Sequence, residues 1–485
     1  MKLEPVIGLE IHVQLKTKSK MFCSCDNTGE NQPPNTTICP VCMGHPGTLP
    51  VVNAEAVRAG IKAALALNLK VNTHSKFDRK NYFYPDLPKG YQISQYDEPL
   101  AQDGYLEVET SQGKTHVGIE RLHLEEDTGK LLHGQGETLV DFNRAGTPLV
   151  EIVTKPEITS PEQAKFFLQQ LRAIMKSLNV SDADMEKGHL RVDVNISLRP
   201  QGDKKLYTKI ELKNLNSFRS VERGLAYEIS RLTELWQKGA PPNVSTTRGW
   251  DENKGISIEQ RSKEAIHDYR YFPEPDLPPL DFLKKDIDAI KKELPELPPA
   301  RVARFKKEYK LSTIDAKILA DDNNLSDFME QAVEQLVAHG EDINKERAAK
   351  LTVNWLVHKL FALLNEIHKS IDLVPFTTSQ FADFLMLVAS RRVNSTNAQL
   401  ILKQMVATGK DAEDILNSED LGPADSADLA GVVSKVMAKY PDQVKQFQGG
   451  KEPVIKFLVG AVMKETKGKA DPVEAEKVLR NTLKS

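Results

Sequence analysis

Apolar and polar residues alternate along much of the first 280 residues. In residues 8–15, GLEIHVQL, apolar side chains alternate with a carboxylate, an imidazole and an amide. A period of two predicts a β-strand with one buried face, and it recurs in RVDVNISLRP and KIELKNLNSFR. Turn-forming sequences such as PDLPKG and AGTP separate these segments, and helical periodicity occupies residues 53–69 and 161–179. The pattern predicts an α+β domain built on an antiparallel sheet.

Strand-like alternation stops after a proline-rich segment at residues 273–300, which indicates an extended connector. From residue 301 onward the periodicity is helical and is broken by Gly and Pro. We therefore expect an N-terminal α+β domain at 1–292, an all-α domain at 293–410 and an all-α tail domain at 411–485.

Charge changes sign within the predicted tail. Residues 411–450 hold 3 basic and 8 acidic side chains, a net charge of −5, whereas residues 451–485 hold 8 basic and 5 acidic ones, a net charge of +3. The whole chain has a net charge of −3, so any surface for nucleic acid must be local. The basic end, with Lys464, Lys467 and Lys469, is the candidate, and the alternative is that these lysines form a solvated helix face.

The 485 residues offer no signal for a membrane. No uninterrupted apolar run approaches the ~18–20 residues that a membrane span needs. The first residues, MKLEPVIG, lack the charged start and apolar core of a signal peptide. We therefore expect a cytoplasmic protein with no membrane partner.

All four cysteines, Cys23, Cys25, Cys39 and Cys42, lie in one loop. Two close pairs around a segment rich in Pro, Asn and Gly predict a zinc site, because tetrahedral thiolate ligation needs two turns that each present two sulfurs. Four protein ligands leave no open coordination position, so the zinc would be structural. The alternatives are four reduced thiols without metal and a disulfide pair, which a cytosolic address disfavours.

Ionisable residues recur on the polar side of the predicted strands. If the strands are neighbours, one sheet face gathers Glu10, His12, Glu125, Glu151, Asp193 and Glu211. Such a cluster repels itself unless a divalent cation neutralises it, and hard oxygen ligands favour Mg²⁺. Arg191, Lys209 and Lys213 are suited to nucleotide phosphate oxygens. An antiparallel sheet with one solvated face shows the same alternation, so periodicity alone leaves both interpretations open.

Several common catalytic motifs are absent from the sequence: GxxxxGK[ST], a GxGxxG after a strand, and GxSxG. A nucleotide must therefore bind without a Walker loop. Covalent catalysis is not expected, because the cysteines are assigned to the zinc loop. A free-standing amidase is excluded, since neither a Ser-Ser-Lys constellation nor a cysteine nucleophile is available.

Long motifs in one order resemble a known family. They are GLEIHVQL, CPVCMGHPGTLPVVN, FDRKNYFYPDLPKGYQISQ, GIERLHLEEDTGK, DFNRAGTPLVEIVTKP, LRVDVNISLRP, ELKNLNSFRSVERGLAYEI, TRGWDENKG, RSKEAIHDYRYFPEPDLPPL and FLVGAVMKETKGKADP. Over essentially the whole chain they resemble the B-subunit (GatB) family of tRNA-dependent aspartyl/glutamyl amidotransferases.

The resemblance implies a heterotrimeric enzyme that converts glutamate mischarged on tRNA-Gln, and aspartate mischarged on tRNA-Asn, into the amide. The A subunit is an amidase that releases ammonia from glutamine, the small C subunit wraps the other two, and the B subunit uses ATP and Mg²⁺ to activate the aminoacyl carboxylate. The resemblance also implies a cradle domain with a kinase-like site, a helical domain and a YqeY-like tail that contacts tRNA. This division agrees with the parts predicted above.

The resemblance assigns the catalytic magnesium site to Glu10, His12, Glu125, Asp193 and Glu211. Glu151 is added from the alternation alone, and His12 is either a ligand or an orienting hydrogen-bond partner.

Cations alternate with aromatic residues in FDRKNYFYPDLPKGYQISQ, where Lys80 and Lys89 are candidates for holding ATP phosphates. Surfaces that bind a nucleotide or the acceptor end of a tRNA have this composition. The alternative is a loop whose aromatic side chains pack onto the domain, because such a loop has the same composition.

The alternative function is a non-catalytic tRNA-binding scaffold. A pure RNA-binding protein has no need of carboxylates beside the path of its phosphates, because without a metal they would repel the RNA. The acidic cluster therefore favours an enzyme.

Overall fold

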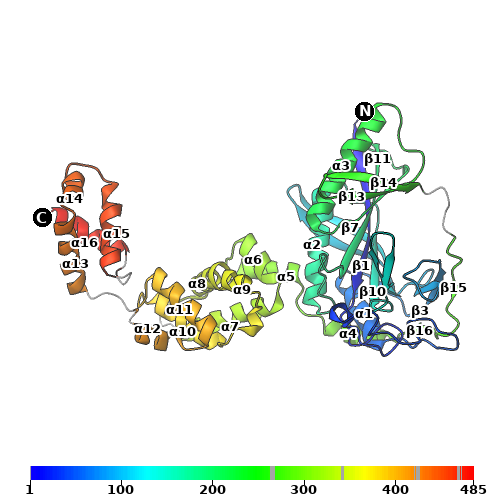
Figure 1. Cartoon of the computed structure of the whole chain (residues 1–485), viewed down its shortest axis with the longest axis horizontal. Coiled ribbons are helices and arrows are strands. Elements are labelled where there is room, and N and C mark those ends of the chain that lie inside the picture. Colours follow the sequence, from blue (N-terminus) through cyan, green and yellow to red (C-terminus); the bar gives the residue numbers. More distant parts are fainter. Residues whose placement is uncertain are drawn as a thin grey trace. The chain divides into compact units, whose positions relative to one another are not determined.

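The computed structural model describes residues 2–262, 268–339, 343–419, 421, 426–466, 470 and 472–484. The chain divides into two compact units, Met1–Pro298 and Pro299–Ser485 (Figure 1). The first unit has one hydrophobic core, and the second has two, within residues 305–416 and 429–483. The domain boundaries expected from the sequence stay a prediction.

A nine-stranded sheet forms the centre of the first unit. Across the sheet its strands are β14 (Ile256–Ser262), β13 (Thr246–Asp251), β12 (Ile210–Lys213), β11 (Leu190–Pro200), β1 (Leu3–Gln14), β10 (Pro148–Thr154), β7 (Gly113–Glu126), β6 (Ala101–Thr110) and β2 (Lys70–Val71). Neighbours are antiparallel except β12 and β13, which are parallel. This pair departs from the expected antiparallel sheet, because α3 (Phe218–Gln237) connects the two strands and reverses the chain between them.

The apolar face of the sheet is covered by α1 (Ala54–Ala66), α2 (Pro161–Ser177) and α3. The odd-numbered residues of β1 from Ile7 to Val13 are buried in the core. Asn53 and Ser160 cap α1 and α2 by accepting hydrogen bonds from backbone N–H groups of the first turn. The predicted helices at 53–69 and 161–179 are therefore confirmed, with slightly shorter ends.

Small sheets lie beside the main one. They are β15 (Phe272–Pro273) with β4 (Asp78–Asn81) and β5 (Tyr91–Ser94), β16 (Leu280–Asp281) with β3 (His74–Ser75), and β8 (Lys130–His133) with β9 (Thr138–Asp141). Figure 1 shows β15 on the opposite side of the main sheet from α2 and α3. The Ser94 hydroxyl of β5 donates to the Glu125 carboxylate of β7 over 3.3 Å, so the three-stranded sheet adjoins the polar face.

The segment at residues 273–300 is not the extended connector that its prolines predict. It contains β16 and α4 (Lys284–Lys292), whose Ile290 is buried in the core of the first unit. Just after α4, Glu293 forms an ion pair with Arg58 of α1. The prolines flank α4 rather than interrupt it, so its apolar residues decide the local structure.

The second unit is helical throughout its described residues, as predicted. Around its first core lie α5 (Pro298–Glu308), α6 (Thr313–Ala320), α7 (Asn323–His339), α8 (Lys345–Trp355), a π-helical turn (Leu356–Leu360), α9 (Phe361–Glu366), α10 (Thr378–Ala389), α11 (Ser395–Thr408) and α12 (Ala412–Ser418). Around its second core lie α13 (Ser426–Lys439), α14 (Pro441–Gln448), α15 (Val454–Glu465) and α16 (Pro472–Lys484). Short 3₁₀ turns occur at Gly29–Asn31 in the first unit and Ile371–Leu373 in the second.

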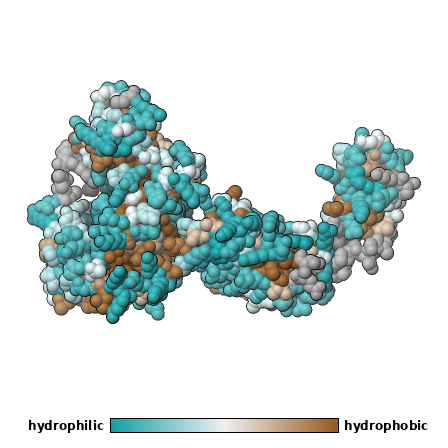
Figure 2. Space-filling view, turned by 180° about the vertical axis from the view of Figure 1, so that it is seen from behind, coloured by the Kyte–Doolittle hydropathy of each residue, from teal (hydrophilic) through white to brown (hydrophobic). Residues whose placement is uncertain are grey.

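Hydrophilic side chains predominate on the face shown in Figure 2, with apolar surface between them. Within the described residues, none of the helices combines the length and the apolar character that a membrane crossing requires.

Candidate active site and metal centres

Strand register brings the predicted polar residues onto one face of the main sheet. His12 lies opposite Glu151 of β10 and opposite Arg191 of β11, and Glu10 lies opposite Asp193. Residues that lie opposite each other on paired strands point to the same face of the sheet. The same register places Glu125, Glu211 and Lys213 on this face. We call it the polar face.

Glu151 is the centre of this face. Its Oε2 lies 3.4 Å from His12 Nε2 and 3.2 Å from His123 Nε2. Glu125 Oε1 lies 3.4 Å from His12 Nε2. Ligand atoms of Glu10, His12 and Glu151 are within 4.8 Å of one another, and so are those of His123, Glu125 and Glu151. Two groups able to hold a cation therefore share one carboxylate.

His123 is a member of this cluster that the sequence analysis leaves out. It is buried, and its Nδ1 has no hydrogen-bond partner among the described residues. Its position in the sequence indicates that it belongs there, because His123 and Glu125 are two residues apart in the alternating segment RLHLEE.

The neighbouring carboxylates raise the pKa of both imidazoles of the cluster. Burial opposes a charge on His12, but the hydrogen bond to Glu151 and the charges of Glu125 and Glu151 raise its pKa to about 9. The same carboxylates raise the pKa of His123 to about 9 against the effect of burial. Burial and the charge of Glu151 raise the pKa of Glu10 above its ordinary value. The cluster therefore stabilises positive charge placed between its carboxylates.

Asp193 and Glu211 lie further along the polar face, where a lysine neutralises them. The Lys213 ammonium donates to Asp193 and lies 3.3 Å from Glu211. The Thr247 hydroxyl donates to Glu211 over 2.7 Å. This carboxylate pair adjoins the histidine-containing groups through Glu10, the cross-strand partner of Asp193, but its own charge is offset by Lys213.

Arg191 is held by a buried carboxylate. Its guanidinium donates to Asp127 Oδ1 over 2.9 Å, and the Gln14 amide donates to Asp127 Oδ2 over the same distance. Although burial opposes ionisation, the charges of Arg191 and Arg144 lower the pKa of Asp127 below its ordinary value. Asp127 is therefore an anion that positions Arg191.

The structure places the lysines predicted to bind ATP in different surroundings. Lys80 of β4 faces the cluster: burial opposes its charge, but Glu125 and Glu151 raise its pKa above the ordinary value. Lys89 instead forms an ion pair with buried Glu126. Lys209 precedes β12 and is exposed.

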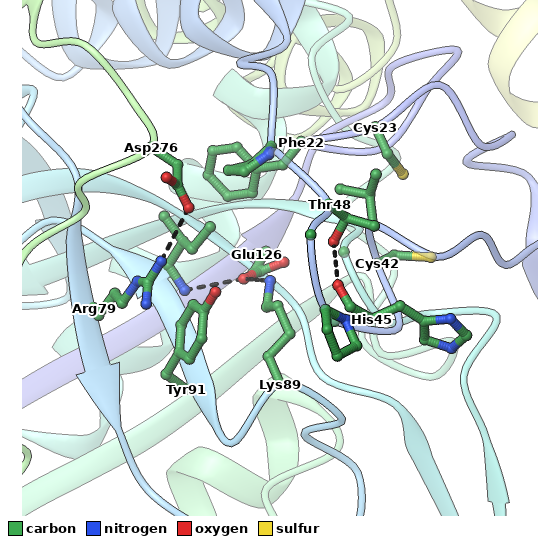
Figure 3. Close-up of a pocket in the computed structure, with 17 residues that line it drawn as sticks. Phe22, Cys23, Cys42, His45, Thr48, Arg79, Lys89, Tyr91, Glu126 and Asp276 are labelled. Carbon is green, nitrogen blue, oxygen red and sulfur yellow. Dashed lines mark hydrogen bonds and ion pairs between the residues drawn. The ribbon is translucent and has the colours of Figure 1, made fainter.

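A cavity of about 230 Å³ lies between the cysteine loop and the β4–β5 strands (Figure 3). Residues along it include Cys23, Cys42, His45, Thr48, Arg79, Lys89, Tyr91, Glu126 and Asp276. Arg79 is fixed by Glu274 at 2.7 Å and by Asp276 at 3.2 Å. The lining residues do not include the histidines and carboxylates around Glu151, so the cavity is separate from that cluster.

The four cysteine sulfurs gather within 4.8 Å of one another, and all four cysteines are free rather than disulfide-bonded. The Cys39 N–H donates to Cys42 Sγ over 3.1 Å. A hydrogen bond from Cys23, with the nearby Lys20 ammonium, lowers the pKa of Cys42 to about 5 despite burial. This arrangement fits a thiophilic cation.

Of the basic residues predicted to contact tRNA, Lys464 is exposed at the end of α15. Lys467 and Lys469 lie outside the described residues.

Comparisons with known proteins cover nearly the whole chain. Residues 5–288 match the family described as GatB/GatE catalytic domain, and residues 327–483 match the family described as GatB domain. The chain is similar to the B subunit of the aspartyl/glutamyl-tRNA(Asn/Gln) amidotransferase of Caldanaerobacter subterraneus subsp. tengcongensis, with 46% identity over 100% of both chains. It is 45% identical to the protein of the same name from Carboxydothermus hydrogenoformans, over 99% of this chain and 98% of the relative. The relative of that name from Persephonella marina is 44% identical over 100% of both chains.

Proposed function

The chain belongs to the GatB/GatE family, and from this membership we propose that its polar face is where ATP activates the carboxylate of a mischarged aminoacyl-tRNA. The chain acts in tRNA-dependent amidotransfer as one component of a multi-subunit, ATP-using ligase. The non-catalytic scaffold considered from the sequence is not favoured.

The observation that carries the proposal is the cluster around Glu151. Two buried carboxylates, Glu125 and Glu151, face two imidazoles, His12 and His123, at 3.2–3.8 Å. Burying carboxylates costs free energy, so clusters of this kind are concentrated at functional sites. A scaffold that only binds RNA would gain nothing from them.

The donor set fits Mg²⁺, because carboxylate oxygens dominate it. We assign Glu10, Glu125 and Glu151 as ligands, with His12 as a ligand or an orienting partner and His123 as a further candidate. A bound Mg²⁺ supplies charge stabilisation for phosphate oxygens.

Asp193 and Glu211 serve this site through the lysine between them. We propose that Lys213, held by this pair, joins Lys80 and Arg191 in offsetting phosphate charge. Lys89 and Lys209 are not included, since Lys89 lies with Glu126 along the separate cavity and Lys209 is exposed.

The reaction needs an activated carboxylate, because a carboxylate is a poor electrophile. A carboxylate oxygen of the aminoacyl group attacks the γ-phosphorus of ATP, and ADP leaves. Ammonia then attacks the carbonyl carbon, the C–O bond to phosphate breaks, and the nitrogen loses a proton. Both steps concentrate negative charge, so positioning and electrostatics are the contribution expected of Lys80, Arg191 and Lys213.

We propose a structural Zn²⁺ in the cysteine loop, held by Cys23, Cys25, Cys39 and Cys42. The grouped sulfurs support this assignment. Four thiolate ligands leave the ion no open position for catalysis.

We further propose a cytoplasmic heterotrimer in which this chain joins an amidase (the A subunit) and a small third protein (the C subunit), acting on tRNA-Gln and tRNA-Asn. The basic tail, including Lys464, Lys467 and Lys469, is proposed to contact tRNA phosphates. Truncation at residue 451 would test this poorly, because α13, α15 and α16 share one core. Substitution of exposed Lys464 is the sharper test.

The experiment uses the complete complex with Glu125→Gln, supplied separately with each mischarged tRNA. tRNA-dependent ATP hydrolysis and amide formation should be lost, while glutamine hydrolysis stays measurable, because the amidase site lies in a partner. Normal amide formation by the variant would contradict the assignment of Glu125.

A further inference from the structure

Lys20 is fully buried, with 0% of its surface exposed. The one polar contact that the described structure gives its ammonium is Cys42 Sγ, at 4.0 Å. No described carboxylate lies within ion-pair distance of it. An ammonium taken out of water is stabilised only by negative charge beside it, and the described group nearest to this one is the Cys42 sulfur.

Hydrogen bonds fix the backbone of Lys20. The Lys20 N–H donates to the Cys25 carbonyl over 3.0 Å, and its carbonyl accepts from the Asn53 side chain over 3.1 Å. The next residue, Met21, donates to the Gly146 carbonyl over 2.8 Å.

The stem of Lys20 is enclosed as well. A Cβ added at Gly146 would lie 3.4 Å from Lys20 Cδ and 3.4 Å from Cys42 Cβ. Gly146 has a φ of +86°, which favours glycine there. The stem of Lys20 therefore runs past Gly146, and its ammonium ends at the cysteine cluster.

The charge of the cluster decides what Lys20 faces. Without a metal, neighbouring thiolates would repel one another, so the cluster offers the ammonium little negative charge beyond that of Cys42. Four thiolates around a divalent cation carry a net charge of −2, which a neighbouring ammonium partly neutralises.

We propose that Lys20 is the built-in countercharge of a metal–tetrathiolate centre, a positioning residue that stabilises the metal-bound cysteine loop. The inference rests on the proposed zinc in this loop. The occupant is a divalent, thiolate-preferring cation such as Zn²⁺. A reactive thiolate is a poorer explanation, because Cys42 is only 5% exposed and a nucleophile must be accessible.

The first test compares Lys20→Met with wild type in the complete complex, with Lys18→Met as the control. Lys18 is exposed in the same segment. Zinc per chain is measured by elemental analysis and zinc affinity by competition with a chelator. Lys20→Met should weaken zinc binding about 10- to 100-fold, the range typical of outer-shell partners, and Lys18→Met should leave it unchanged.

The second test separates charge from packing. Lys20→Met is combined with Cys39→Ser and Cys42→Ser, which remove the metal, and the thermal midpoint of the complex is measured. Lys20→Met should lower the midpoint when the cysteines are present and raise it when they are replaced, because it then removes an uncompensated buried charge.

The outcomes separate this inference from the proposed function. If the wild-type chain contains zinc and Lys20→Met binds zinc with unchanged affinity, the result would overturn only the role proposed for Lys20. A midpoint lowered equally in both backgrounds, or loss of folding in both, would do the same by showing that Lys20 only packs. Wild-type chain that binds no zinc would overturn the zinc proposal and this inference together.

Discussion

Replacing Glu151 by Gln should slow carboxylate activation strongly while preserving the fold. The substitution removes one negative charge at nearly constant volume from a side chain that belongs to both candidate cation groups. Glu151 is 5% exposed, so water cannot take the place of the lost charge.

The structure sets the size of the effect. Glu151 Oε2 lies 3.2 Å and 3.4 Å from two imidazole nitrogens, and a unit charge at such a distance interacts with a cation by about 5 kcal/mol at an effective dielectric constant of about 20. Part of this gross value is offset by desolvation in the wild type. If about half of it is expressed in the transition state, about 2.5 kcal/mol is lost, which is a rate loss of about 70-fold.

The assay measures amide formation, tRNA-dependent ATP hydrolysis and glutamine hydrolysis in the complete complex. Glu120→Gln is the matched control, because Glu120 is an exposed carboxylate on the neighbouring strand β7. Amide formation within twofold of wild type in Glu151→Gln would refute the reasoning, as would an equal loss in the control.

Three further outcomes are expected. Cys39→Ser with Cys42→Ser should remove about one zinc per chain and lower the thermal midpoint more than it lowers the rate of amide formation; elemental analysis and melting curves check this. Lys464→Gln should raise the apparent KM for tRNA and reduce its dependence on salt, by a slope of about 0.7–0.9 for one lost phosphate contact, with kcat unchanged in titrations at two salt concentrations. Glu330→Gln should reduce the local stability of α7 at pH 7 by about 1 kcal/mol, since Arg304 and Tyr309 donate to this carboxylate over 2.9 Å. Burial opposes ionisation of Glu330, but these hydrogen bonds lower its pKa below 4.5. Hydrogen exchange should therefore show the full difference in stability between wild type and variant above that pH, and a smaller difference as the pH falls through the lowered pKa.

The alternation in the sequence predicts which residues share a strand face, because the side-chain period of a strand is two. It cannot predict which strands are neighbours, since β1 pairs with β10 and β11, more than a hundred residues away in the chain. The polar face was therefore an interpretation until the register placed His12 beside Glu151.

Adjacent residues on a strand point to opposite faces of the sheet, and this explains why Lys80 and Lys89 meet different carboxylates. Glu125 and Glu126 are neighbours on β7, but Glu125 contacts the histidines and Glu126 contacts Lys89 beside the cavity. A loop sequence rich in Lys and Tyr carries no information about which of these carboxylates each lysine meets. Buried Lys20 likewise has no mark in the sequence, because its environment is assembled from Gly146 and the cysteine loop.

The central claim is that the carboxylate on the tRNA is phosphorylated at the polar face. The most direct measurement uses mischarged Glu-tRNA carrying ¹⁸O in the side-chain carboxylate, with mass analysis of the inorganic phosphate released by the complete complex. Phosphorylation followed by attack of ammonia predicts one ¹⁸O in phosphate for each amide formed, and a transfer in Glu151→Gln that is slowed as much as amide formation. Phosphate without ¹⁸O at a normal yield of amide, or transfer at the wild-type rate in the variant, would contradict the account.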